Sequence, residues 1–210
     1  MSIKNIFQLN FWLLFLGLCI ANLIAMYGVS NILWDDDTYL KNFTGSDFQN
    51  YISSIRSIDL YRYLLSPFYL LIKSFAVASV FYSATILIRK EIEFVSLLHI
   101  TLVAEIAFIL VDLSKVFWFL VVQPEYSATD LKEFYPLSLY QAIGGIEGWL
   151  SYPLRTINIF QIIYIIVVAR GLKTISVSNE SQFAFTFTVY GLSLFFWIIL
   201  WSFIGISFLN

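Results

Sequence analysis

The stretch Thr101–Lys115, TLVAEIAFILVDLSK, carries three charged residues inside a segment that is otherwise apolar enough to cross a membrane. Residues separated by four, three, four and three positions share one face of an α-helix, and here they are Thr101, Glu105, Phe108, Asp112 and Lys115. A charge at the middle of a bilayer costs roughly 2.5–3.5 kcal/mol on insertion scales, so this face cannot point at lipid. We therefore expect it to face other helices or a partner protein.

The composition indicates an integral membrane protein. Of the 210 residues 60% are hydrophobic and 12% are charged, with a mean hydropathy of +0.81, whereas soluble domains carry about 25% charged residues. A net charge of −2 provides no basic surface for nucleic acid, so we expect no nucleic-acid partner. The single cysteine, Cys19, lies in an apolar run and excludes an intrachain disulfide; we interpret it as a packing residue.

Five apolar segments predict an all-α, polytopic membrane helix bundle that forms one transmembrane domain over residues 1–210. The predicted spans are about 6–29, 64–88, 94–122, 154–168 and 183–208. The first is long enough for an uncleaved span rather than a signal peptide, and its Gly17, Ala21 and Ala25 form either a close-packing face or an ordinary run of small residues. The second has Pro67 in its first turn, where a missing amide hydrogen costs little.

The loop 30–62 is predicted to lie outside and to contain a short amphipathic helix. Ser46–Gln49 resembles a capping box, and the apolar positions after it have helical spacing. These apolar positions are Phe48, Ile52, Ile55 and Ile58. The Asp35–Asp37 triplet lacks the alternating ligands of a calcium loop, so we interpret it as a solvated acidic turn. Asn42–Thr44 would accept a glycan in a eukaryotic secretory compartment.

The second outer loop, 123–152, is acidic at first and then aromatic. Tyr140, Ile143, Ile146 and Trp149 have near-helical spacing, with a break at Gly144–Gly145. We expect an interfacial or re-entrant segment with Tyr and Trp at headgroup depth.

The distribution of cations predicts the orientation. With a cytoplasmic amino terminus, the inner segments hold five cations in about 24 residues and the outer loops hold four in about 60. The inner cations are Lys4, Arg89, Lys90, Arg170 and Lys173. Because cytoplasmic loops are enriched in Lys and Arg, we expect the amino terminus inside and the carboxyl terminus outside.

The fourth and fifth spans resemble the YIP-type family of five-span membrane proteins. The resemblance rests on Ile157–Gln161 (INIFQ) through Ala169–Lys173 (ARGLK), followed by a short polar link and an aromatic last helix. It implies a cytoplasmic amino terminus, a short outer carboxyl tail and, for eukaryotic members, association with Rab GTPases and vesicle trafficking. We expect a multi-pass protein of the bacterial inner membrane or, alternatively, of a eukaryotic secretory-pathway membrane.

Depth along the spans predicts how the buried charges pair. Counted from outer boundaries at residues 64 and 122, Lys73 lies about 1.5 Å in depth from Asp112 and about 12 Å from Glu105. We therefore expect a Lys73–Asp112 pair with Lys115 and Arg155 nearby. Glu105 would then lack a cation, and would be protonated or would meet a partner subunit.

This cluster of charges has three interpretations: a neutralised network that fixes helix packing, a docking site for a partner, or an ion or proton pathway. Phosphate-binding, metalloprotease and nucleophile-elbow motifs do not occur in the sequence. We expect no enzyme, no cofactor and no metal, and interpret His99 as a hydrogen-bonded core or interface residue.

The predicted function is therefore a scaffold or accessory subunit of a membrane complex, in trafficking or secretion, with a membrane-protein partner or a second copy of the chain. The alternative is a small transporter or an ion- or proton-coupled subunit that uses Lys73, Glu105 and Asp112. Five spans cannot be divided into two equal repeats, which disfavours transport by this chain alone.

Overall fold

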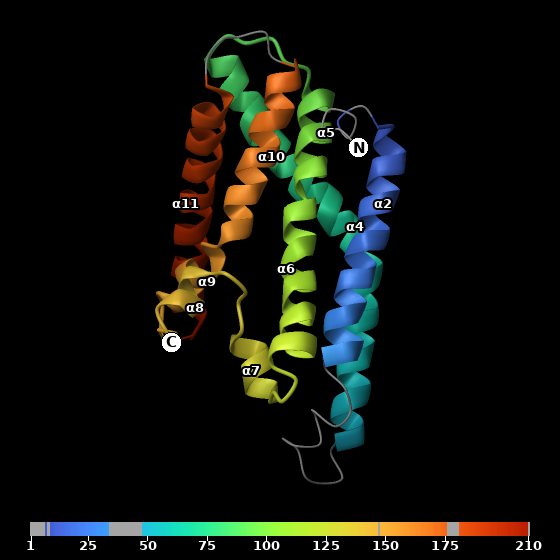
Figure 1. Ribbon diagram of the computed structural model, residues 1–210. Coiled ribbons are helices and arrows are strands. Elements are labelled where there is room, and N and C mark those ends of the chain that lie inside the picture. Colours follow the sequence, from blue (N-terminus) through green and yellow to red (C-terminus); the bar gives the residue numbers. More distant parts are fainter. Residues whose placement is uncertain (1–6, 8, 34–47, 147, 176–180, 210) are drawn as a thin grey trace.

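The described residues fold as an elongated bundle of helices (Figure 1). A computed structural model describes residues 7, 9–33, 48–146, 148–175 and 181–209. The elements are α2 (Phe11–Tyr27), η1 (Gly28–Leu33), α4 (Phe48–Leu87), α5 (Phe94–Ala104), α6 (Ile106–Phe117), η2 (Trp118–Val122), α7 (Ala128–Glu133), α8 (Leu139–Ala142), α9 (Ser151–Thr156), α10 (Ile159–Ile175) and α11 (Gln182–Leu209). The prediction of an all-α fold is confirmed.

Among the described residues, four helical segments are long and apolar enough to cross a membrane. They are Phe11–Ser30, Ile58–Leu87, Phe94–Val122 and Gln182–Ile204. This confirms the prediction of a multi-pass membrane protein. The predicted fourth span corresponds to α10, which has 17 residues and is therefore about 26 Å long, a little short of the roughly 30 Å hydrocarbon core.

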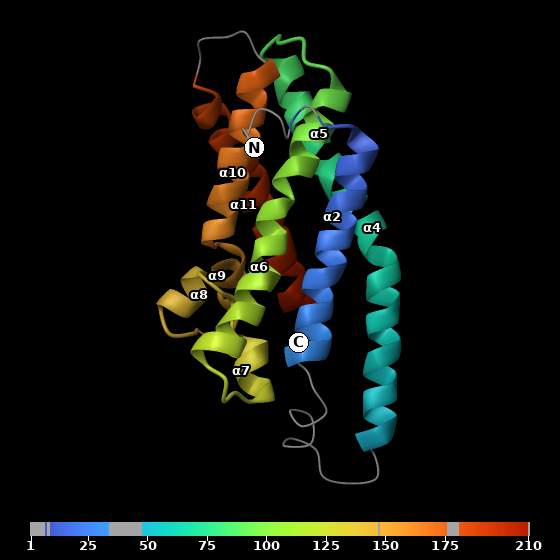
Figure 2. The ribbon, with the colours of Figure 1, turned by 45° about the vertical axis from the view of Figure 1, so that its right-hand side comes forward.

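The long helices alternate in direction along the bundle. Figures 1 and 2 show that α2, the α5–α6 pair and α11 run in one direction, and that α4 and α10 run in the opposite direction. Half of the α5–α6 span is buried, against 17% of α2 and 11% of α11. The α5–α6 pair is therefore the central span, and α2 and α11 lie at the periphery.

Two apolar clusters lie on either side of the central span. The first joins α4, α5, α10 and α11 and contains Phe81, Ile100, Tyr164, Leu172 and other buried residues. The second joins α2 and α4 to the central span through Leu14, Leu18, Leu70, Leu102 and Ile109. Because both clusters use the central span, its position determines where its charged residues lie.

Helix α4 is longer than predicted, because it runs without interruption from Phe48 through Pro67 to Leu87. A proline in a helix leaves the carbonyl four residues earlier without its amide donor. Here that carbonyl belongs to Tyr63, and it accepts a hydrogen bond of 3.2 Å from Ser66 Oγ. The helix predicted over residues 48–58 is therefore present, but it continues into the second span instead of forming a separate helix in the loop.

Several predictions fall on residues outside the described part of the chain. They concern the inner cation Lys4, the acidic triplet Asp35–Asp37, the glycan acceptor Asn42–Thr44 and the first half of the capping box, Ser46–Asp47.

Close packing of the first span occurs near its end. Gly17 is exposed, and a Cβ added there would meet no atom within 4 Å. Ala25 is 1% exposed, and a Cβ on Gly28 would lie 3.0 Å from Val116 Cγ2. The predicted small-residue face is thus correct at Ala25. The first span approaches α6 most closely at Gly28.

The predicted break in the second outer loop is confirmed. Gly144 and Gly145 have φ values of +78° and +75°, and Gly148 has +88°. These left-handed conformations favour glycine and end α8 at Ala142. Tyr140 and Trp149 therefore do not share one helix, contrary to the spacing of the apolar residues.

Helix α7 begins with a reciprocal cap. Ser127 Oγ accepts from the Asp130 amide at 3.2 Å, and Asp130 Oδ2 accepts from the Ser127 amide at 2.8 Å and from its hydroxyl at 2.7 Å. The two hydrogen bonds from Ser127 hold the pKa of the Asp130 carboxyl below its usual 3.8.

We expect this cap to contribute pH-dependent stability to α7. A lowered carboxyl pKa contributes stability above the usual value, and that contribution is lost as the pH falls through the lowered pKa. Hydrogen-exchange protection of α7, corrected for intrinsic rates, should hold down to about pH 4 and decrease below it. Asp130→Asn should remove the pH step, and α10 serves as the internal control. Equal pH profiles for wild type and variant would contradict the prediction.

Candidate functional site

The central span is interrupted at Glu105. Helix α5 ends at Ala104 and α6 begins at Ile106, so Glu105 caps both helices. The Glu105 amide donates to Leu102 O at 3.2 Å, which tightens the turn. The side chain points into the bundle, and the residue is 4% exposed. The break therefore lies at the most buried charge of the predicted site.

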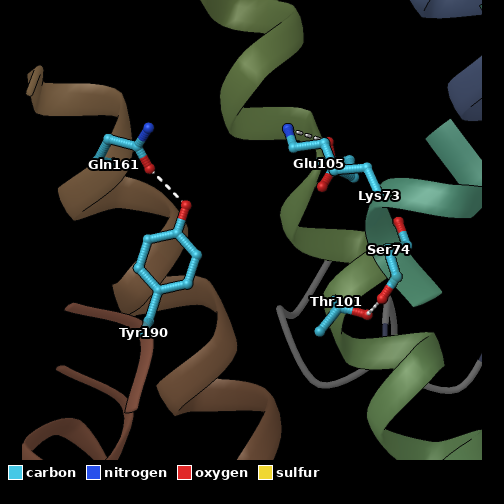
Figure 3. A network of polar contacts seen from close by, with 6 residues as sticks. All are labelled: Lys73, Ser74, Thr101, Glu105, Gln161 and Tyr190. Atoms are coloured by element: carbon cyan, nitrogen blue, oxygen red, sulfur yellow. Dashed lines mark hydrogen bonds and ion pairs between the residues drawn. The ribbon is translucent and has the colours of Figure 1, made fainter. Parts of the chain in front are cut away.

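Glu105 forms an ion pair with Lys73 of α4 (Figure 3). Lys73 Nζ lies 2.8 Å from Glu105 Oε2 and 3.3 Å from the centre of the Phe108 ring. The carboxylate and the ring both stabilise the ammonium. The predicted Lys73–Asp112 pair was wrong, and so was the expectation that Glu105 lacks a cation.

The packing register of α4 and α5 explains this correction. Thr101 Oγ1 donates to the carbonyl of Ser74 at 3.1 Å, so residues 74 and 101 lie at one level (Figure 3). Along two antiparallel helices, moving up one residue number in one helix means moving down one in the other. Asp112 lies 11 residues after Thr101, so it lies level with about residue 63, which is 11 residues before Ser74. Counting depth from predicted span boundaries could not find this register.

Asp112 is instead near cations on its own helix and at the start of the second span. These cations are Lys115 and Arg62. Lys115 Nζ also donates to the carbonyl of Leu131, which connects α6 to α7. The predicted neighbourhood of Asp112 and Lys115 is thus confirmed, while Arg62 was missed because it was assigned to a loop.

Arg155 belongs to a third site. Its terminal nitrogens donate to Tyr135 Oη at 3.2 Å and to Tyr140 Oη at 3.3 Å, and the guanidinium lies 4.6 Å and 4.5 Å from the centres of the two rings. The extended backbone at Ile157 separates α9, which carries Arg155, from α10. The predicted single cluster around Asp112 is therefore divided among separate places in the fold.

Polar side chains of α10 and α11 extend the site around Glu105. Tyr164 is fully buried, and its ring lies 5.2 Å from Phe108 and 4.8 Å from Tyr190. Tyr190 Oη donates to Gln161 Oε1 at 2.5 Å (Figure 3). Tyr164 and Tyr190 were not predicted as part of the site. Each places a hydroxyl group in an otherwise apolar helix, and this pattern could have indicated them.

Some buried atoms of this network have no hydrogen-bond partner among the described residues. They are Glu105 Oε1, Ser74 Oγ and Tyr164 Oη. Buried polar atoms are nearly always paired with protein or water. These three atoms therefore keep unused hydrogen-bonding capacity around the ion pair.

His99 and Cys19 have no role in this site. His99 Nε2 is buried and has no hydrogen-bond partner in the described part of the chain, and its ring lies edge-on to Phe11 at 6.1 Å. The expected hydrogen bond of His99 is thus not made by Nε2. Cys19 is 7% exposed and packs in the core, as predicted. Within the described residues no group of three His, Cys, Asp or Glu residues could hold a metal.

Comparison of the chain with protein-family models, curated proteins and solved structures gives no match. The resemblance to the YIP-type family stays a prediction.

Proposed function

We propose that this chain is a non-enzymatic integral membrane protein that acts as a scaffold or accessory subunit of a membrane complex. One observation carries the proposal: the buried charges Lys73 and Glu105 neutralise one another within the chain, while α2 and α11 leave most of their apolar surface uncovered. A neutralised interior fixes helix packing, and uncovered peripheral helices are free for lateral contacts.

The proposed architecture has five spans, with α10 as the fourth. Helix α10 packs between α5, α6 and α11 and buries Phe160, Tyr164, Val168 and Leu172. A fifth crossing places the two ends of the chain on opposite sides of the membrane. The excess of cations in the predicted inner segments favours a cytoplasmic amino terminus. The bacterial inner membrane is the proposed location, with a secretory-pathway membrane as the alternative.

The exposed aromatic surface of α11 is the proposed contact surface. Its large exposed aromatic residues lie on more than one side of the helix: Phe183, Phe187, Phe195, Phe196, Trp197, Trp201 and Phe203. Aromatic residues are enriched in the central parts of interfaces between proteins. We propose a membrane-protein partner or a second copy of the chain at this surface, in a trafficking or secretion complex as the YIP-type resemblance suggests.

Purification in a mild detergent tests this function. We expect the chain to elute with a stoichiometric membrane-protein partner or as a defined oligomer. Phe196→Ala with Trp197→Ala on α11 should reduce this association at least tenfold, because buried aromatic side chains dominate interface energies. The matched control is Leu16→Ala with Ile20→Ala, which removes exposed apolar surface from α2. A monodisperse single chain in both detergent and native lipid discs would refute the scaffold proposal.

An ion- or proton-coupled subunit that uses Lys73, Glu105 and Asp112 is the second candidate. It is favoured by the unpartnered Glu105 Oε1 and Tyr164 Oη beside the ion pair. Purified protein in liposomes would then conduct protons or monovalent cations, and Glu105→Gln would abolish the flux. Flux no greater than that of empty liposomes, from correctly folded protein, would exclude this candidate for the isolated chain.

A further inference from the structure

A second polar site lies at the end of the bundle that carries α7 and α8 (Figure 1). A cleft of about 240 Å³ is lined there by Phe119, Gln123, Asp130, Glu133, Phe134, Tyr140, Gln141, Gly144 and Gly145. Asp130 and Glu133 are its charged groups, and none of these residues is a cation. Carboxylates and aromatic rings both attract positive charge, so the cleft favours a cationic group.

An uncompensated cation lies beside this cleft. Arg155 is oriented by the hydroxyls of Tyr135 and Tyr140, and among the described residues no carboxylate bonds to it. Neutral phenols orient the guanidinium without cancelling its charge. Each terminal nitrogen uses one N–H on a tyrosine and keeps a second, whereas Nε is buried and has no partner among the described residues. The two remaining terminal N–H groups, which lie in one plane, suit the oxygens of a phosphate.

Tyr140 joins the two subsites. Its hydroxyl accepts from Arg155, its side chain lines the cleft, and a Cβ on Gly145 would lie 3.2 Å from that hydroxyl. A site for an anion and a site for a cation are therefore separated by one tyrosine side chain. We propose that together they bind the headgroup of a zwitterionic phospholipid, with its phosphate at Arg155 and its ammonium in the cleft.

The surroundings favour a lipid over a soluble molecule of the same chemistry. Beside the site, exposed apolar side chains lie on and between α8 and α9: Leu137, Leu139, Ile143, Trp149 and Leu150. Tryptophan and tyrosine are enriched at headgroup depth, where apolar neighbours can contact acyl chains. An anionic lipid without an ammonium group would meet Asp130 and Glu133 and would be disfavoured.

Native mass spectrometry of the full chain, extracted from lipid discs that contain equal phosphatidylethanolamine and phosphatidylglycerol, tests this proposal. We expect the wild type to retain phosphatidylethanolamine preferentially. Arg155→Gln should lower total retention about tenfold, because it removes a charged donor to phosphate. Glu133→Gln should lower the preference for phosphatidylethanolamine severalfold. Lys132→Gln, an exposed change between the two acidic residues, is the matched control and should alter neither quantity.

Arg155→Lys distinguishes a loss of lipid binding from a loss of folding. It keeps the positive charge but loses the planar arrangement of N–H donors of the guanidinium group. It should fold like the wild type and retain an intermediate amount of lipid. Equal retention of the two lipids by the wild type, or an unchanged preference in Glu133→Gln, would overturn the proposal. Full competition by soluble glycerophosphoethanolamine at concentrations comparable to the lipid would also overturn it, since it would assign the site to a free headgroup ester.

Discussion

Replacing Lys73 with methionine is expected to destabilise the protein by about 3–5 kcal/mol, because it leaves a buried carboxylate without its cation. The Glu105 side chain is only 5% exposed, so water cannot replace the lost ammonium. Glu105→Gln should cost less, since the Phe108 ring, 3.3 Å from Lys73 Nζ, still stabilises the ammonium after the carboxylate is lost. The measurement is the free energy of unfolding in mixed micelles of mild and denaturing detergent.

The double replacement Lys73→Met with Glu105→Gln tests whether the loss of stability comes from leaving one charge of the ion pair unpaired. It should be more stable than Lys73→Met alone, because no buried charge is left unpaired. Lys73→Met with Asp112→Leu should instead be additive, since these residues do not pair. Lys173→Met changes an exposed lysine in the last turn of α10 and should alter stability by less than about 0.5 kcal/mol. Wild-type stability of Lys73→Met would contradict the structural role of the ion pair.

Gly171→Ala is expected to destabilise the bundle by about 1–3 kcal/mol through overpacking. A Cβ at Gly171 would lie 2.6 Å from Ile100 Cγ2 and 2.8 Å from Phe7 Cε1. These distances are too short for carbon atoms, so either the Ile100 and Phe7 side chains or the helix α10 would have to shift. The free energy of unfolding measures the effect in the same detergent mixture.

Gly17→Ala is the matched control for Gly171→Ala. It makes the same change in α2, where an added Cβ meets no atom within 4 Å. Because alanine is the better helix former, this variant should equal or exceed wild-type stability by up to about 1 kcal/mol. Ile100→Ala should be non-additive with Gly171→Ala, since it removes the side-chain atoms that the new methyl group meets. Equal effects of the two glycine substitutions would contradict close packing at Gly171.

The spans could be predicted from the sequence because each is a long apolar run, and the need to turn charges away from lipid correctly placed Glu105 in the interior. The partner of Glu105 could not be predicted in the same way. Depth was counted from assumed membrane boundaries, whereas the register is determined by side-chain packing and by the bond from Thr101 to the Ser74 carbonyl. A shift of a few residues in an antiparallel helix pair changes which charges meet.

The position of Arg155 was missed for a different reason, and here the sequence contained a usable signal. Asn158 Oδ1 accepts from the Gln161 amide at 3.1 Å, which caps the start of α10. An asparagine followed three residues later by glutamine resembles a capping box and indicates a helix beginning there. It separates Arg155 from the apolar helix α10 and assigns it to the segment before that helix, where α9 lies.

The uninterrupted course of α4 also determines how far the protein extends from the membrane. Its 40 residues span about 60 Å, roughly twice the thickness of the hydrocarbon core. Its apolar segment lies within Ile58–Leu87, and about 20 residues suffice to cross the core, so the first turns of α4 extend beyond the core and continue in the same helix to Lys73. A partner that bound only this protruding end could turn or shift the helix and so act on the Lys73–Glu105 pair without entering the bilayer.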